Sequence, residues 1–370
     1  MLMKRLLFLT AICLVAAGRA LPAHADADWP CFRGSSLMTG VAHTPFTATP
    51  HLAWTYDTGS QVESTAAIVG DRVYVGTKTR ALLALSLSTG KLQWKFMAQG
   101  AVTAAPLVVG DVLYVGDEAG WFHALNLYNG HELWNFKTGE KIISSAAAAP
   151  GVVLFGSYDY NLYCLRAGTG SVKWTFATEA QVHCSPCVTG DTVIIAGCDG
   201  KVRMIDLDSG KQKTAAELQT NMSAAPAYSS GTVFLGTLNG LYVAVRMSDG
   251  AQLWRMEETR DGAACYASAA VLGDAVIFAS RSQTVYRVNR LSGKTEWLFT
   301  APGGFDSSPV IAGDTIFLGS SDGNIYGLRL SDGAKVWQYA AGGEITASPA
   351  LGQGHLVIGS LDGTLYCFSR

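Results

Sequence analysis

The stretch YVGDEAGWFHALNLYNGHELW, residues 114–134, decides the fold because the chain repeats it. It contains apolar runs that alternate with turn residues, and it ends on a tryptophan. Forty residues later, residues 154–174 read LFGSYDYNLYCLRAGTGSVKW, with two glycines and the tryptophan at matching places. A fixed period of this length is typical of an array of small structural units, so the repeat is the first property to explain.

The tryptophan that ends each stretch marks eight equivalent positions along the chain. Most of them are forty residues apart, and a three-residue insertion in EETRDGAACY, residues 257–266, displaces the last two. The eight positions are Trp54, Trp94, Trp134, Trp174, Thr214, Trp254, Trp297 and Trp337.

Each repeat contains four short apolar runs separated by turn residues. Gly-Asp, Asn-Gly, Thr-Gly or Asp-Gly pairs lie between the runs, and these residues tolerate the positive φ that tight hairpins require. No stretch shows a sustained helical period, so we expect minimal helix. The pattern predicts an all-β fold, an eight-bladed β-propeller of four-stranded antiparallel blades.

The two ends of the array predict how the ring closes. The segment HLAWTYD, residues 51–57, reads as an outer strand but precedes the first complete inner strand, which is expected to begin near Val62. The last repeat ends at GTLYCFSR, residues 363–370, with three strands and no fourth. We therefore expect residues 51–57 to complete the eighth blade beside residues 364–369, which leaves the ring without an open seam.

The first 25 residues have the features of a secretory signal peptide: a basic start, an apolar run and the cleavage site Ala23-His24-Ala25. The apolar run is short for a bilayer span and no second one follows, so we expect no transmembrane segment. Residues 26–50 then form an N-terminal segment and residues 51–370 the propeller. We expect an exported monomer, periplasmic or secreted.

Composition and charge narrow the function classes. Hydrophobic residues make up 49% of the chain and charged residues 15%, which favours a large core over disorder. The leader contains Lys4, Arg5 and Arg19 and no acid, so its removal takes the formal net charge from −2 to −5. A mildly acidic chain without basic clusters argues against nucleic acid and anionic lipid as partners.

Three quoted segments carry a resemblance to a known family. SSDGNIYGLRLSDGAKVWQY (residues 320–339) and SLDGTLYCF (residues 360–368) resemble the repeat of the pyrroloquinoline-quinone-type (PQQ-like) propellers. DWPCFRGSSLMTG, residues 28–40, resembles the segment that precedes the ring in secreted members. The resemblance covers residues 28–370 and implies the propeller fold, which hosts many unrelated functions.

The resemblance implies three kinds of function. Quinoprotein dehydrogenases hold a quinone and a calcium ion on the ring axis, whereas the propeller subunit of the outer-membrane β-barrel assembly machinery is a binding scaffold. Other exported members have unassigned partners. The chain resembles the assembly subunit more than the dehydrogenases, because its blades are a bare forty residues and it has no adjacent Cys-Cys pair.

The residues that a quinone or calcium site would use have simpler explanations. Evenly spaced tryptophans place one in each blade, which is the pattern of packing anchors rather than of one stacking site. The candidate calcium ligands Asp199, Asp322 and Asp362 each precede a glycine in a predicted hairpin, where Asp favours the turn. We therefore expect no cofactor and a non-enzymatic function, with a dehydrogenase that uses PQQ and calcium as the alternative.

The stretch HCSPC, residues 183–187, is the most unusual in the chain. Cys184 and Cys187 resemble a redox or metal motif, but in an extended strand they lie about 10 Å apart on opposite faces, beyond disulfide reach. His183 and Cys198 are better placed, because the hairpin brings them opposite each other. Small-residue packing is favoured, and a metal or redox site at His183 and Cys198 is the alternative.

One position breaks the repeat in every blade, namely the residue that opens the inner strand. The eight residues are Glu63, Thr103, Ile143, His183, Ser223, Tyr266, Asp306 and Thr346. Such variation is expected of a recognition surface and equally of an unconstrained loop. We predict a binding face for an envelope protein or surface polymer, formed by Glu63, His183, Tyr266 and Asp306 together with Arg260 and Asp261 of the inserted loop.

Overall fold

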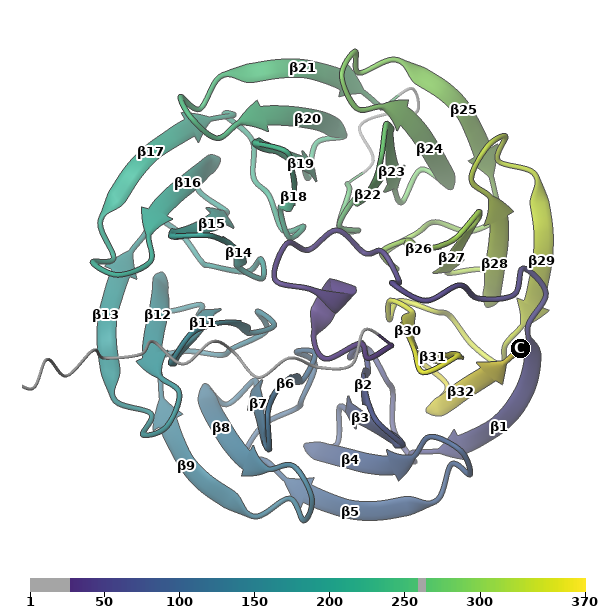
Figure 1. Ribbon diagram of the computed structural model, residues 1–370, viewed down its shortest axis with the longest axis horizontal. Helices are drawn as coiled ribbons and strands as arrows, with labels where there is room; N and C mark the ends of the chain where they lie inside the picture. Colours follow the sequence, from purple (N-terminus) through teal and green to yellow (C-terminus); the bar gives the residue numbers. More distant parts are fainter. Residues whose placement is uncertain (1–26, 259–263) are drawn as a thin grey trace, which may run out of the picture.

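The computed structural model describes residues 27–258 and 264–370, which form a ring of eight four-stranded sheets (Figure 1). We number these sheets blades 1–8 in chain order and call their strands A to D from the axis outward. The described residues contain a single helix, η1 (Phe32–Gly34), of three residues. The predicted all-β, eight-bladed propeller with minimal helix is therefore confirmed.

The strands follow the same order in every blade. Blade 1 contains β2 (Ala67–Val69), β3 (Arg72–Gly76), β4 (Ala81–Ser86) and β5 (Leu92–Met97), and all neighbouring strands are antiparallel. The strands of blades 2–4 are β6 (Leu107–Val109), β7 (Val112–Gly116), β8 (Trp121–Asn126), β9 (Glu132–Lys137), β10 (Ala147–Ala149), β11 (Val152–Gly156), β12 (Asn161–Arg166), β13 (Val172–Ala177), β14 (Cys187–Thr189), β15 (Thr192–Ala196), β16 (Lys201–Asp206) and β17 (Gln212–Glu217). Those of blades 5–7 are β18 (Ala227–Ser229), β19 (Thr232–Gly236), β20 (Leu241–Arg246), β21 (Gln252–Glu257), β22 (Ala270–Leu272), β23 (Ala275–Ala279), β24 (Thr284–Asn289), β25 (Thr295–Thr300), β26 (Val310–Ala312), β27 (Thr315–Gly319), β28 (Asn324–Arg329) and β29 (Lys335–Ala340).

Blade 8 joins the two ends of the chain. It consists of β30 (Ala350–Gly352), β31 (His355–Gly359), β32 (Thr364–Ser369) and, as its outer strand, β1 (His51–Asp57). The pairing runs from His51 opposite Ser369 to Asp57 opposite Thr364. Figure 1 shows this contact where purple β1 meets yellow β32. The predicted closure by residues 51–57 is confirmed.

The A strands are shorter than predicted, with only three residues each. The first of them begins at Ala67 and not near Val62. The residues before it lie against the preceding blade, because the N–H of Val62 donates to the carbonyl of Ser360 at 3.1 Å. In blade 2 the N–H of Val102 donates in the same way to Thr77 at 3.0 Å. The segments nearest the axis therefore tie blades together before they enter their own sheets.

The repeated tryptophans pack between neighbouring blades, one at every contact except that between blades 4 and 5, where Thr214 occupies the position. The indole N–H of Trp54 donates to the carbonyl of Leu87 at 2.7 Å, and that of Trp94 donates to Leu127 at 3.1 Å. The turn beneath Trp54 contains Gly90 at φ +69°, where an added Cβ would lie 2.8 Å from the ring. The tryptophan therefore requires glycine in the neighbouring turn, as expected of a packing anchor.

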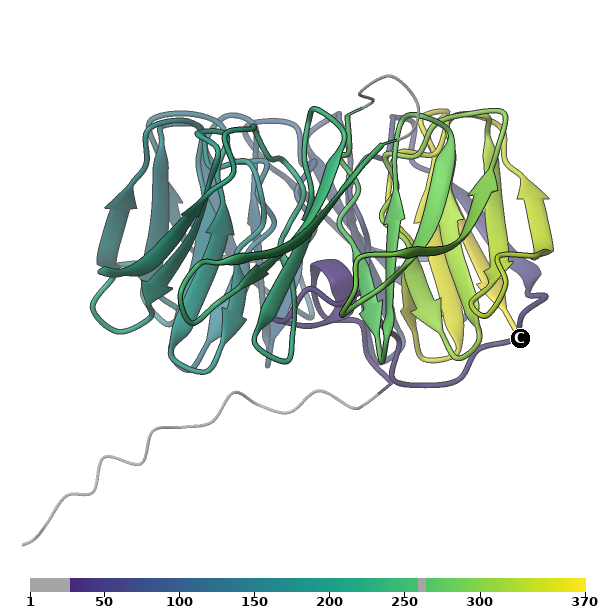
Figure 2. The ribbon, with the colours of Figure 1, turned by 90° about the horizontal axis from the view of Figure 1, so that it is seen from above.

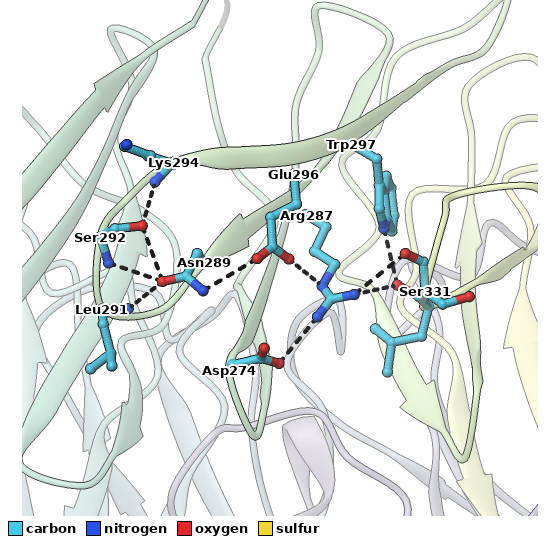
Figure 3. Close-up of polar contacts among 10 residues, drawn as sticks. Asp274, Arg287, Asn289, Leu291, Ser292, Lys294, Glu296, Trp297 and Ser331 are labelled. Atoms are coloured by element: carbon cyan, nitrogen blue, oxygen red, sulfur yellow. Dashed lines mark hydrogen bonds and ion pairs between the residues drawn. The ribbon is translucent and has the colours of Figure 1, made fainter.

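Arg287 strengthens one of these contacts, between blades 6 and 7 (Figure 3). Trp297 and Arg287 both donate to the carbonyl of Leu330, at 3.0 and 3.3 Å. The guanidinium of Arg287 also pairs with Asp274 at 3.1 Å and with Glu296 at 2.9 Å. Arg287, which is paired with two carboxylates, thus contacts the next blade beside Trp297.

The N-terminal segment plugs the ring. Figures 1 and 2 show it crossing one face, with η1 inside the central opening. The backbone of Trp29 exchanges two hydrogen bonds with Ile68 in blade 1, both of 2.8 Å. Further along, the carbonyls of Ser36 and Leu37 accept from Val188 in blade 4 and Tyr228 in blade 5. The segment is therefore part of the folded ring.

The buried side chain of Arg33 accounts for the arginine and the last glycine of the motif DWPCFRGSSLMTG, which lies within this plug. Its side chain is 1% exposed, and its Nη2 donates to the carbonyls of Ala269 at 3.0 Å and Pro309 at 2.6 Å. An added Cβ at Gly40 would lie 1.8 Å from this guanidinium, so only glycine fits there. Burial lowers the pKa of Arg33 to about 9. Arg33 thus fixes the plug to blades 6 and 7.

Candidate binding cavity on the ring axis

All eight non-repeating positions lie around one cavity on the ring axis. The cavity has a volume of about 170 Å³. Its lining consists of these eight residues, the eight residues two positions further along the same segments, and Phe32. We call the first set the rim: Glu63, Thr103, Ile143, His183, Ser223, Tyr266, Asp306 and Thr346.

The second set, the belt, contains only small residues. Its members are Thr65, Ala105, Ser145, Ser185, Ala225, Ser268, Ser308 and Ser348. The N–H of Ala105 donates to Ser145 Oγ at 2.9 Å, and the N–H of Ser145 donates to Ser185 Oγ at 3.0 Å. The same bond, at 2.9 Å, links three further donor and acceptor pairs: Ala225 and Ser268, Ser268 and Ser308, and Ser308 and Ser348. The belt therefore joins blades 2–4 and blades 5–8.

An ion-pair chain forms the rim at blades 1 and 2. Lys78 Nζ lies 3.1 Å from the carboxylate of Glu63 and 3.2 Å from that of Glu118. The hydroxyl of Thr103 donates to Glu118 at 3.1 Å. The side chains of Lys78, Glu63 and Glu118 are about one-third exposed. Because exposed ion pairs contribute little to stability, these contacts mainly fix the positions of the side chains.

A second cluster forms the rim at blades 6 and 7. The guanidinium of Arg281 donates to both oxygens of Asp306, at 2.7 and 2.8 Å, and lies 4.1 Å from the ring centre of Tyr266. This two-point bond to Asp306 raises the pKa of Arg281 above its ordinary value. Tyr266 is therefore held by a cation on one side, which pre-organises its contact surface.

The third cluster contains the rim histidine. Nδ1 of His183 lies 2.6 Å from the hydroxyl of Tyr158, and Lys141 Nζ lies 4.4 Å from the Tyr158 ring centre. Burial, followed by the charge of Lys141, lowers the pKa of His183. Burial raises the pKa of Tyr158 to about 12. At neutral pH the protonated Tyr158 hydroxyl can thus donate to a neutral imidazole.

The structure adds cavity neighbours that the sequence analysis missed. Lys78, Tyr158 and Arg281 each lie fifteen residues beyond a rim residue, in the turn that joins strands B and C. The residue type at this position of the repeat also changes from blade to blade. Variation within the repeat, the signal that marks the rim, therefore marks these residues as well. The predicted residues Arg260 and Asp261 lie outside the described part of the chain.

The cysteines of HCSPC are buried in an apolar core cluster. Cys184 and Cys187 are both free and at most 1% exposed, as the packing interpretation expects. The Cys198 sulfur lies near the backbone of His183 and 3.6 Å from the carbonyl of Met222. The His183 ring instead meets Tyr158. Within residues 27–258 and 264–370, no three His, Cys, Asp or Glu side chains group so that they could hold a metal ion.

The cavity residues do not fit a calcium-bound quinone. Calcium prefers six to eight oxygen ligands from several carboxylates and carbonyls. The two carboxylates of the lining, Glu63 and Asp306, are instead paired with Lys78 and Arg281. Asp199, the first of the predicted alternative ligands, is paired with Arg203 at 2.7 Å. The other two, Asp322 and Asp362, accept backbone N–H groups of their own turns, at 3.0 and 2.8 Å.

The amino-acid sequence matches a family model described as outer membrane protein assembly factor BamB, over residues 46–150 and 123–339. Two overlapping matches are what a repeat array gives when it aligns in more than one register. The chain belongs to this family of PQQ-like propellers. Among curated proteins, no sequence matches it.

Solved structures share the family fold. BamB from Moraxella catarrhalis has a TM-score of 0.77 and 17% identity, covering 87% of this chain and 100% of that one. A quinohemoprotein alcohol dehydrogenase from Comamonas testosteroni has a TM-score of 0.80 and 14% identity, covering 92% of this chain and 80% of that one. A europium-containing methanol dehydrogenase has a TM-score of 0.80 and 12% identity, covering 94% and 98%. At these identities the likeness shows the fold alone.

In the part of the chain that the structure describes, no helix has the length and apolar character needed to span a membrane.

Proposed function

We propose that this PQQ-like propeller is an exported, non-enzymatic binding scaffold whose rim face captures an envelope protein or a surface polymer. One observation carries the proposal. In a chain that repeats its scaffold closely, eight equivalent positions whose residue type varies from blade to blade surround a single cavity.

The rim clusters support recognition because their side chains are already held in place. Arg281 and Asp306 fix Tyr266, and Lys78 fixes Glu63. A surface that is ordered before binding loses less conformational entropy when a partner arrives. Tyrosine and arginine are also common anchors at protein interfaces.

The alternative, a quinone-dependent dehydrogenase, has fold-level support from the solved dehydrogenase structures. The paired carboxylates of the cavity weigh against it. A second alternative is an outer-membrane assembly factor, which the family description favours. That version expects outer-membrane β-barrels among the captured proteins.

Capture from an envelope extract tests the scaffold function. Tyr266→Ala and Arg260→Ala should weaken capture, because truncating a true interface anchor costs about 2 kcal/mol or more. Asp71→Ala and Asp111→Ala are the controls, since these residues lie in the turns between strands A and B on the opposite face. If the rim-face and control variants retain the same partners equally well, the proposed face is wrong.

A further inference from the structure

The axial cavity has one open end, so a ligand must enter it end-on. Phe32 lines the cavity, and the plug that carries Phe32 is hydrogen-bonded to A strands around the ring. The volume of about 170 Å³ is well above the roughly 10–15 Å³ that a cavity needs to hold one water molecule. The cavity has room for a ring-sized group at the end of a chain, and the plug stands in the way of a polymer that would pass through.

The cavity wall is made mostly of hydroxyl groups. Ten of its residues are Ser, Thr or Tyr, spread over both rim and belt. In the bonds described above, the belt serines accept backbone N–H groups, and within the described residues their hydroxyls donate to no other atom. Ser223, on the rim, is 8% exposed and its Oγ has no partner among the described residues. Each such hydroxyl can both donate and accept.

The charges of the cavity disfavour an ionic ligand. No Lys or Arg belongs to the lining, and Lys78 and Arg281 beside it are paired with its two carboxylates, so a phosphate or carboxylate would meet no unpaired cation among these residues. Both lining carboxylates already have a cation, at 3.1 Å for Glu63 and at 2.7 Å for Asp306. These carboxylates still have lone pairs that accept hydrogen bonds from a neutral ligand. An apolar ligand would leave the hydroxyls unpaired, which is costly.

We propose that the axial cavity binds the terminal residue of a neutral saccharide chain. This inference rests on the proposed recognition function of the rim and assigns its ligand class. A sugar ring offers hydroxyls that donate and accept around its whole edge, which matches a wall that presents Ser and Thr hydroxyls on several sides of the axis. Tyr266 supplies a flat apolar surface, and Arg281 holds it in place at 4.1 Å.

The probe is a panel of linear oligosaccharides of neutral hexoses and N-acetylhexosamines, immobilised through their reducing ends. The mature protein should bind chains with one type of terminal sugar, and bulky capping of that terminus should abolish binding. Ser223→Ala and Tyr266→Ala should each weaken binding at least tenfold. The matched control is Tyr128→Ala, which removes an equally large, 56% exposed tyrosine on the opposite face.

The outcomes separate the two proposals. If no chain binds the mature protein better than it binds Ser223→Ala and Tyr266→Ala, the saccharide assignment is wrong. If Tyr266→Ala nevertheless loses envelope-protein capture, the rim stands as a protein interface. If capped and uncapped chains bind equally, end-on entry is wrong. If Tyr266→Ala retains both sugar binding and protein capture, the recognition function itself fails.

Discussion

The belt and the rim are two rings of eight residues that lie two positions apart and face the same cavity, yet they differ in composition. The belt contains only Ser, Thr and Ala, whereas the rim includes acids, a histidine, a tyrosine and an isoleucine. The difference follows from their contacts. Belt hydroxyls accept backbone N–H groups of the neighbouring blade, so folding restricts them, while rim side chains form local clusters that folding does not require.

The interface between blades 4 and 5 sharpens this comparison. It lacks the tryptophan, because Thr214 occupies that position, and it lacks the belt hydroxyl, because Ala225 stands opposite the N–H of Ser185. The plug spans this interface, since Ser36 and Leu37 accept hydrogen bonds from the A strands of blades 4 and 5, as other plug residues do from the A strands of blades 1, 2, 6 and 7. The interface between blades 4 and 5 therefore keeps its plug contacts but lacks both repeated side-chain contacts.

The largest effect is expected from opening the ring on which both the belt and the rim depend. Deleting residues 26–57 removes the plug and β1, and with them the outer strand of blade 8. We expect the melting temperature of the mature chain to fall by about 10 °C or more, because many backbone hydrogen bonds and buried side chains are lost together. Differential scanning calorimetry measures this change. An unchanged melting temperature would contradict closure by β1.

A matched pair of serine substitutions compares belt and rim directly. Ser308→Ala should lower the free energy of unfolding by about 1–3 kcal/mol, because it leaves the buried N–H of Ser268 without its acceptor. Ser223→Ala removes a hydroxyl that has no partner within the described residues and should cost much less. Urea unfolding of both variants provides the measurement. Equal losses would show that the two rings are not distinct in their structural role.

Restoring a missing belt hydroxyl should have a smaller effect of opposite sign. Ala225→Ser places an acceptor opposite the N–H of Ser185, where blades 4 and 5 lack the belt bond. We expect a gain of about 1 kcal/mol in the free energy of unfolding, the usual net value of one hydrogen bond. Ala105→Ser offers a second site of the same kind between blades 1 and 2. A loss of stability in both variants would refute the role assigned to the belt.

We expect the protein neither to bind pyrroloquinoline quinone nor to turn over substrates with it. Incubation with pyrroloquinoline quinone and calcium should produce neither bound-cofactor absorbance nor dye reduction driven by alcohols or sugars, because Glu63 and Asp306 are paired with cations. A heat-treated sample is the control. Turnover well above that control would favour the dehydrogenase and make the rim a substrate site.

The sequence predicted the features that repetition makes visible. The forty-residue register defines the blades, and the unpaired strands at both ends define the closure. Periodicity could not reveal the plug, because Arg33 contacts Ala269 and Pro309, more than 200 residues away and without any repeated partner. The rim was visible as variation at one position. Its neighbours Lys78 and Arg281 were not predicted, because the prediction used variation at only one position of the repeat.

The claim that the rim recognises a partner is tested most directly by a variant in which the rim residues are made alike. The variant combines Glu63→Thr, His183→Thr, Tyr266→Thr and Asp306→Thr, since threonine already occupies two rim positions. Its melting temperature should change little, because exposed ion pairs contribute only about 0–1 kcal/mol each. Capture of partners from an envelope extract should fall at least tenfold relative to the unmodified mature chain. Unchanged capture by a stably folded variant would contradict recognition by the rim.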